Sequence, residues 1–105
     1  MEIKFDKEYL RELYDTGATT DKKYRFQPDI VKRYQARVET LEGAGNVEKL
    51  LAINSLRYEK LKGDKAGLES IRVNNQYRIE FKTTQVVSET IVTICNIIEL
   101  SNHYK

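Results

Sequence analysis

Two arginines on neighbouring strands are the residues of this chain whose spacing points most directly to chemistry. Polar and apolar residues alternate through Glu69–Lys82 on both sides of residues 74–76, which predicts two strands joined by a three-residue loop. The register that puts both apolar sets on one face pairs Arg72 directly with Arg78. The apolar residues of that face are Ile71, Val73, Tyr77, Ile79 and Phe81. Like charges in this position repel, at a cost of about a few tenths of a kcal/mol.

Two interpretations of the arginine pair remain open. Glu69, Glu80 or water could screen the two charges, which would make the pair a neutral structural feature. Alternatively, the two guanidinium groups form an anion site on the polar face of the sheet, because guanidinium groups grip phosphate oxygens through paired hydrogen bonds. We favour the anion site.

The remaining candidate residues flank this hairpin. His103 is the one histidine, and its ordinary pKa of about 6.5 suits proton transfer near neutrality. It lies either in a frayed tail or beside the sheet, anchored by the apolar strand before it. Upstream, Leu61–Gly67 is typical of a charged turn between two glycines and lacks the spacing of a Walker phosphate loop. Cys95 lies among isoleucines, which indicates a buried thiol.

The composition excludes several classes of protein. With 105 residues, 40% apolar and 32% charged, the chain predicts a single globular domain over residues 1–105. One cysteine and one histidine exclude an internal disulfide and the usual zinc ligand sets, so no cofactor and no metal are expected. The longest apolar stretch, Thr90–Leu100, is about half of the roughly 20 residues that span a bilayer. The sequence starts without the apolar run of a secretion signal, so we expect a cytoplasmic protein and no membrane partner.

Positive charge is concentrated in two segments, although the formal net charge is only +2. Residues 21–37 carry six Lys and Arg against two Asp, and residues 57–82 carry seven against four Asp and Glu. Such clusters either bind a polyanion or simply solvate a surface.

The hydrophobic pattern predicts an α+β domain with the order β-α-α-β-β-β-β. A strand at residues 2–6 precedes a helix that is capped by Asp6 and ends near Gly17. Pro28 opens a second helix that ends at residues 43–45, and Asn46 caps a short helical turn through Leu51. Further strands are expected near residues 56–61, 68–73, 77–82 and 90–100. Short links favour an antiparallel sheet of four to five strands, with the helical hairpin packed on one face.

The order of three motifs resembles the HigB branch of the RelE/ParE toxin superfamily. These motifs are Leu61-Lys62-Gly63-Asp64, then Ser70-Ile71-Arg72-Val73, and then Tyr77-Arg78-Ile79-Glu80-Phe81. The resemblance covers essentially the whole chain and implies a RelE-like fold. It also implies the toxin of a type II toxin–antitoxin pair, which cleaves mRNA on the translating ribosome and is neutralised by a HigA-like helix-turn-helix antitoxin.

The resemblance assigns roles to particular residues. Lys62 matches the motif lysine and Arg78 the strand arginine, while His103 and Tyr104 match the tail of the family. Many relatives have His-Pro directly before Leu-Lys-Gly, where this chain has Glu59-Lys60. Glu59 could therefore act as the base, or the tail could take that role.

These residues suit RNA cleavage without a metal, because RNA supplies its own nucleophile in the 2′-hydroxyl. Arg72 and Arg78 would stabilise the phosphate, Lys62 would contact it or transfer a proton, and His103 would be the first acid/base candidate. The residues expected to bind RNA are Lys60, Lys65, Lys82 and Lys105, and Tyr77 or Tyr104 could stack on a base. Two alternatives are a ParE-like inhibitor of DNA gyrase and a non-catalytic module that binds nucleic acid.

Overall fold

A computed structural model describes residues 1–102 of the chain. Its elements are β1 (Glu2–Phe5), α1 (Glu8–Thr16), η1 (Lys22–Tyr24), α2 (Pro28–Gly43), α3 (Val47–Leu51), η2 (Asn54–Leu56), β2 (Glu59–Lys60), η3 (Gly63–Lys65), β3 (Glu69–Arg72), β4 (Arg78–Val87) and β5 (Ile91–Ser101). The predicted α+β order is confirmed. None of the helices in residues 1–102 has the length and apolar character needed to cross a bilayer.

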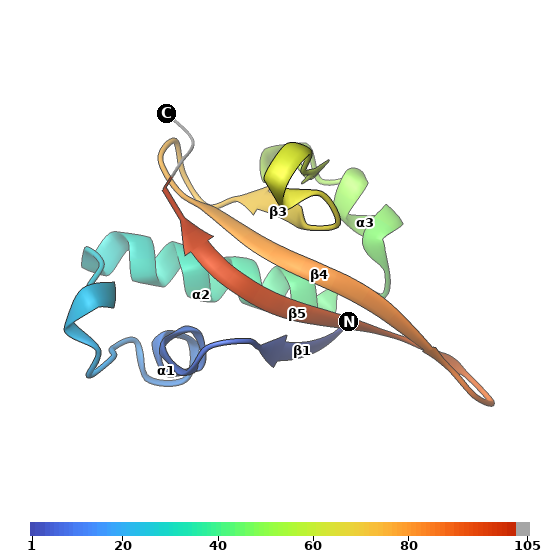
Figure 1. Cartoon of the computed structure of the whole chain (residues 1–105), viewed down its shortest axis with the longest axis horizontal. Coiled ribbons are helices and arrows are strands. Elements are labelled where there is room, and N and C mark those ends of the chain that lie inside the picture. The colour runs from blue at the N-terminus through green and yellow to red at the C-terminus, as the bar shows by residue number, and fades with distance from the viewer. Residues whose placement is uncertain (103–105) are drawn as a thin grey trace.

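The five strands form one sheet in the order β1-β5-β4-β3-β2. Figure 1 shows β5 between β1 and β4. The pairs β2–β3, β3–β4 and β4–β5 are antiparallel, as the short links predict. The edge strand β1 instead runs parallel to β5, with Glu2 opposite Ile94, so the sheet is mixed rather than wholly antiparallel. This difference arises because β1 reaches β5 through the helices and the other strands, a connection long enough for a parallel pair.

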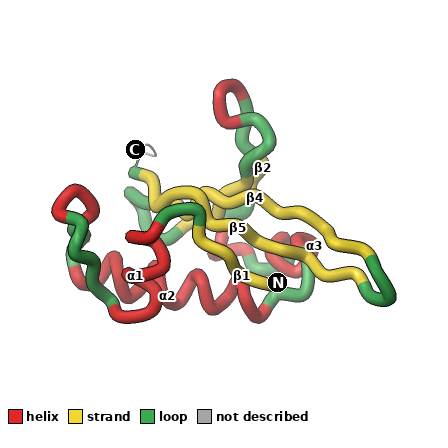
Figure 2. The backbone as a smooth tube through the Cα atoms, turned by 60° about the horizontal axis from the view of Figure 1, so that its bottom comes forward, coloured by secondary structure: helices red, strands yellow, loops and turns green. Residues whose placement is uncertain are grey.

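The helical hairpin covers one face of the sheet, as predicted (Figure 2). The core joins the inward side chains of both helices to those of the sheet. Among the most buried of these are Leu10, Leu13, Tyr34, Val38, Leu41, Ile71, Ile79, Phe81 and Ile97. The hydroxyl of Tyr34 also donates a 2.7 Å hydrogen bond to the carbonyl of Leu10, which ties α2 to α1. We call the opposite face of the sheet the outer face.

All but one of the predicted helix boundaries are confirmed. Gly17 ends α1 in the left-handed conformation with φ 79°, and Pro28 occupies the first turn of α2. The side chain of Asn46 accepts a 3.1 Å hydrogen bond from the backbone N–H of Lys49. The prediction that Asp6 caps α1 is wrong, because Asp6 prolongs the strand pairing through a 2.8 Å bond from its N–H to the carbonyl of Ile97. The N-cap of α1 is instead Lys7, one residue later.

The strands differ in length from the prediction. β2 is only two residues long, because residues 54–56 form η2 instead of a strand. β4 continues five residues beyond the predicted end at 82, since the stretch Thr-Thr-Gln-Val-Val is rich in β-branched residues that pair with the start of β5. The two strands therefore project from the sheet as a ribbon (Figure 1). Exposed apolar side chains gather at its tip, namely Val86, Val87, Ile91 and Val92.

Cys95 should be unreactive in the folded protein. Its side chain is fully buried in β5, and burial raises the pKa of the thiol from 9.0 to about 12. At pH 8 the thiolate fraction falls by about 1,000-fold, and we expect labelling by a disulfide reagent to require urea. Between pH 9 and about 12 the unfolded chain loses this proton while the folded chain keeps it, so stability should decrease as pH rises. Rapid labelling without denaturant would contradict this burial.

Candidate active site

The predicted hairpin register is confirmed, and it brings the two arginines together. Arg72 pairs with Arg78 across β3 and β4, and Ile71 pairs with Ile79. Both isoleucines are fully buried on the helix face, so the alternation of side chains puts both arginines on the outer face. The side-chain oxygen of Asn74 fixes the loop, because it accepts hydrogen bonds from the backbone N–H groups of Gln76, at 2.9 Å, and Tyr77, at 2.7 Å.

A hollow of about 270 Å³ lies where these arginines meet the end of η2. We call it the arginine hollow, and its lining consists of Arg57, Arg72, Asn74, Asn75 and Arg78. Among residues 1–102, three guanidinium groups line it and no carboxylate does. Three positive charges in one concave site attract a polyanion much more strongly than the same charges spread over a surface.

Arg78 is held rigidly at the floor of the hollow. Only 8% of the residue is exposed. Its Nε donates a 2.9 Å hydrogen bond to the hydroxyl of Ser70, and its Nη2 donates to the backbone carbonyls of Arg57 and, at 3.5 Å, of Ser70. These acceptors fix the plane of the guanidinium group before any ligand arrives, which is the condition for strong electrostatic stabilisation of a developing negative charge.

Arg72 is held by the hairpin loop. Its Nε donates a 3.2 Å hydrogen bond to the carbonyl of Asn74, and its Nη2 donates to the side-chain oxygen of Asn75. Both acceptors are neutral, so these bonds orient Arg72 without cancelling its charge. The side chain is half-buried and remains part of the lining of the hollow.

The two carboxylates that were considered as screens for the arginine pair lie on different faces of the sheet, and Glu80 shares the outer face with the arginines. Glu69 lies on the helix face, where its carboxylate accepts hydrogen bonds from Tyr58 and Thr83, so screening by Glu69 is wrong. Glu80 accepts a 2.6 Å hydrogen bond from Lys65. Glu59 is the carboxylate at the rim of the hollow: its Oε1 lies 3.8 Å from Nε of Arg78, and about half of its side chain is exposed.

Lys62 is not part of the lining of the hollow. It immediately precedes η3 in a loop that is closed by a 2.9 Å bond from the N–H of Leu61 to the carbonyl of Leu68. Gly63 supports the turn with φ 65°. The ion pair between Lys65 and the buried Glu80 attaches this loop to the outer face, from which it rises in Figure 2. The Lys62 side chain is exposed in this loop.

The predicted RNA-binding lysines do not form one patch. Lys60 lies on the helix face, because its partner across β2 and β3 is Glu69. Lys65 is engaged with Glu80. Lys82 follows Arg78 by four positions on β4, so it is exposed on the outer face, where it lines a separate hollow near Lys4. His103, Tyr104 and Lys105 lie outside the described residues.

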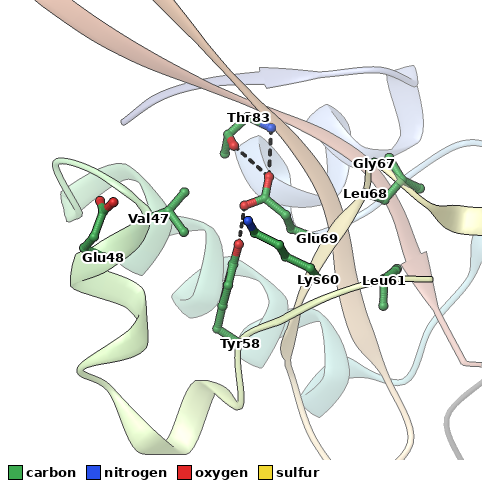
Figure 3. A pocket seen from close by; sticks show the side chains of 9 residues that line it. All are labelled: Val47, Glu48, Tyr58, Lys60, Leu61, Gly67, Leu68, Glu69 and Thr83. Carbon is green, nitrogen blue, oxygen red and sulfur yellow. Dashed lines mark hydrogen bonds between the residues drawn. The ribbon is translucent and has the colours of Figure 1, made fainter.

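Another pocket, of about 430 Å³, lies on the helix face beneath α3 (Figure 3). At its centre, the carboxylate of Glu69 accepts hydrogen bonds of 2.5 Å from the Tyr58 hydroxyl, 3.1 Å from the N–H of Thr83 and 2.7 Å from the Thr83 hydroxyl. Burial, together with the bond to Glu69, raises the pKa of Tyr58. These contacts join β3 and β4 to the segment that precedes β2, so we interpret this cluster as structural.

Arg57 is the residue of the hollow that the sequence does not reveal. It follows η2 with φ 45° and ψ 51°, a left-handed conformation that the sequence Asn-Ser-Leu-Arg-Tyr does not indicate, because it contains no glycine. Alternation of the buried Leu56 and half-buried Tyr58 would have placed Arg57 on the outer face, but not beside Arg78. Within residues 1–102, no group of three or more His, Cys, Asp or Glu side chains is arranged to hold a metal ion.

A family model described as the RelE-like toxin of the type II toxin–antitoxin system HigB matches residues 3–94. This match covers most of the chain and includes the loop with Lys62 and all three arginines of the hollow. A search of curated protein sequences finds no match.

Two solved structures share the fold. The YoeB/ParE toxin from Agrobacterium tumefaciens superposes with a TM-score of 0.59 at 18% sequence identity, covering 99% of this chain and 100% of that chain. The YoeB–YefM complex from Staphylococcus aureus gives a TM-score of 0.54 at 20% identity, covering 99% of this chain and 98% of that chain. The RelE-like fold is thereby confirmed.

Proposed function

The chain belongs to the HigB-like toxins, which are RelE-like toxins of type II toxin–antitoxin systems, and from this premise we propose that it cleaves mRNA on the translating ribosome. The observation that carries the proposal is the arginine hollow, in which a buried, oriented Arg78 lies beside two further guanidinium groups. A fold of this kind supports more than one activity, so the site rather than the fold decides the proposal.

The reaction requires the 2′-oxygen of a ribose to attack the adjacent phosphorus. A bond forms between phosphorus and the 2′-oxygen, and the bond between phosphorus and the 5′-oxygen breaks. One proton leaves the 2′-hydroxyl and another reaches the departing 5′-oxygen, which gives a 2′,3′-cyclic phosphate and a 5′-hydroxyl. Negative charge accumulates on the phosphate oxygens during the attack, and Arg78 and Arg72 would stabilise it there.

Glu59 and His103 are the candidates for proton transfer. Glu59 lies at the rim of the hollow, 3.8 Å from Arg78, which is near enough to act on a ribose that enters the site. His103 comes two positions after Ser101 in the sequence, and Ser101 is paired with Arg78. Lys62 would contact the phosphate or transfer a proton, Lys82 would contact the RNA backbone, and Tyr104 would stack on a base.

Replacing His103 with glutamine is expected to lower the cleavage rate by about 10²-fold or more while ribosome binding changes little, because general acid–base groups typically contribute 10²–10⁴-fold. Single-turnover primer extension on ribosome-bound mRNA measures the first quantity, and co-sedimentation with ribosomes the second. Glu59→Gln provides the comparison, since the larger loss identifies the main proton-transfer group. Equal losses in cleavage and binding for His103→Gln would assign it to positioning instead.

We propose a HigA-like helix-turn-helix antitoxin as the partner that neutralises the toxin, and the cytoplasm, where ribosomes and mRNA are found, as its location. The test of the proposed function combines two assays on one preparation. Primer extension should show new 5′ ends in translated mRNA, and DNA supercoiling by gyrase should remain unaffected. Inhibited gyrase with intact mRNA would favour a ParE-like activity, and salt-sensitive RNA binding without cleavage would favour a binding module.

A further inference from the structure

We propose that Arg57 has two roles in the arginine hollow. Its backbone carbonyl positions Arg78, and its side chain is a third phosphate contact. The side-chain role rests on the proposed function, whereas the positioning role is a property of the folded chain alone. Arg57 lies outside the three motifs named in the sequence analysis, although the family match over residues 3–94 includes its position. Its place in the site follows from its backbone conformation.

The backbone of Arg57 is in an unusual conformation. Within residues 1–102 it is the one residue other than glycine with a positive φ. Such strain persists only where neighbouring contacts determine the conformation, and it is concentrated at functional sites. Both neighbours of Arg57 are anchored: Leu56 is fully buried in the core, and the Tyr58 hydroxyl is bonded to Glu69. The chain between these two anchors is therefore forced through the left-handed turn.

The left-handed turn determines the direction in which the backbone carbonyl of Arg57 points. The oxygen of Arg57 accepts a hydrogen bond from Nη2 of Arg78, while Ser70 accepts from Nε. The two acceptors lie on different segments and fix the guanidinium plane from two sides. A change in the φ of Arg57 would turn this carbonyl away and leave Ser70 to orient Arg78. Arg57 is thus a positioning residue for Arg78.

The side chain of Arg57 differs from the other two guanidinium groups. It is exposed and lines the hollow, and among residues 1–102 no hydrogen bond or ion pair holds it. Arg72 and Arg78 are both oriented by neighbouring acceptors. An unrestrained guanidinium group at the mouth of a cationic hollow can follow an incoming phosphate, and it contributes to binding in the ground state as well as in the transition state. Its loss should therefore raise KM more than it lowers kcat.

Three substitutions separate the two roles. Arg57→Asn removes the charge but retains a residue that tolerates the left-handed conformation, whereas Arg57→Val removes the charge and strongly disfavours that conformation. Arg57→Lys keeps the charge. Arg33→Ala, on the exposed side of α2, is the control for loss of a surface arginine.

For the side chain, Arg57→Asn is expected to raise KM for ribosome-bound mRNA by about tenfold and to reduce the salt dependence of RNA binding by about one charge, while Arg57→Lys changes both much less. For the carbonyl, Arg57→Val is expected to lower kcat by about a further tenfold relative to Arg57→Asn, with a lower urea midpoint. The ¹⁵N-detected Nε–H signal of Arg78 should stay sharp in Arg57→Asn and broaden in Arg57→Val.

Each role has a result that overturns it. An unchanged KM and salt dependence in Arg57→Asn would overturn the side-chain role. Equal kcat values, together with equal Arg78 Nε–H signals in the Asn and Val variants, would overturn the positioning role. If the wild-type protein does not cleave mRNA on ribosomes, the proposed function and the side-chain role fail together, and the NMR comparison still decides whether Arg57 positions Arg78.

Discussion

Replacing Arg78 with alanine is expected to lower the rate of ribosome-dependent mRNA cleavage by about 10²–10³-fold, the range observed when one oriented donor to a developing charge is removed. The expectation follows from the way Arg78 is held. It is 8% exposed, and its bonds to Ser70 and Arg57 prevent it from reorienting during the reaction. Primer extension under single-turnover conditions measures the loss.

Because Arg78 is buried, its removal also affects stability. The substitution leaves the acceptors of Ser70 and Arg57 without their donor, which should cost about 1–3 kcal/mol of unfolding free energy. Circular dichroism and urea unfolding must therefore accompany the rate measurement. Arg78→Lys retains the charge but not the planar fork, so it should recover most of the stability and little of the rate. A folded Arg78→Ala protein with the rate of the Arg33→Ala control would eliminate the arginine hollow as the site of cleavage.

The second large effect is expected at the ion pair that holds the loop of Lys62. Lys65 Nζ lies 2.6 Å from Oε2 of Glu80, whose side chain is 1% exposed. Lys65→Met removes one partner of a buried charge, a change that costs about 3–5 kcal/mol when both partners are buried. Since about a third of the Lys65 side chain is exposed, we expect a loss of about 1–3 kcal/mol in urea unfolding.

A double-mutant cycle isolates this interaction. Glu80→Gln in the Lys65→Met background should restore part of the lost stability, because the buried charge is then absent. Amide exchange at Leu61 and Leu68, whose backbones close the loop, should accelerate in Lys65→Met and not in the exposed-lysine control Lys32→Met. Additive effects of the two substitutions, with unchanged amide exchange, would show that the ion pair does not hold the loop.

Much of the fold could be predicted from the sequence because side-chain periodicity is a direct consequence of local geometry. The alternation in β3 and β4 defined the odd-numbered loop and so the pairing of Arg72 with Arg78. The helical spacing in residues 28–43 defined which side of α2 is buried. Pro28, Gly17 and Asn46 marked helix boundaries because each residue type suits one particular cap position.

Features that depend on contacts distant in the sequence could not be predicted in this way. The parallel pairing of β1 requires knowledge of where β5 lies, and the extension of β4 depends on the partner strand. The left-handed turn at Arg57 is imposed by Leu56 and Tyr58, which are anchored to the core and to Glu69. The residue types around Arg57 do not indicate this left-handed turn. The engagement of Lys65 with Glu80 is equally non-local.

The two faces of the sheet carry different groups of polar side chains, one structural and one proposed to bind phosphate. On the helix face, Glu69 of β3 is bonded to Thr83 of β4 and to Tyr58, which precedes β2, and these polar groups satisfy one another. On the outer face, the guanidinium groups of Arg57, Arg72 and Arg78 converge on one hollow, and the part of the chain that the structure describes contributes no carboxylate to its lining. A cationic site of this kind is complementary to a phosphate that gains negative charge, which connects the geometry to the proposed reaction.

The most direct test of the proposed function is the chemical identity of the RNA ends formed on translating ribosomes. Attack by the 2′-hydroxyl leaves a 2′,3′-cyclic phosphate on the upstream fragment and a 5′-hydroxyl on the downstream fragment. We expect ligation-based mapping to find both ends at the same cut sites with the wild-type protein and neither with Arg78→Ala. Fragments with 5′-phosphate ends, or intact mRNA in cells whose growth the toxin has arrested, would contradict the mechanism.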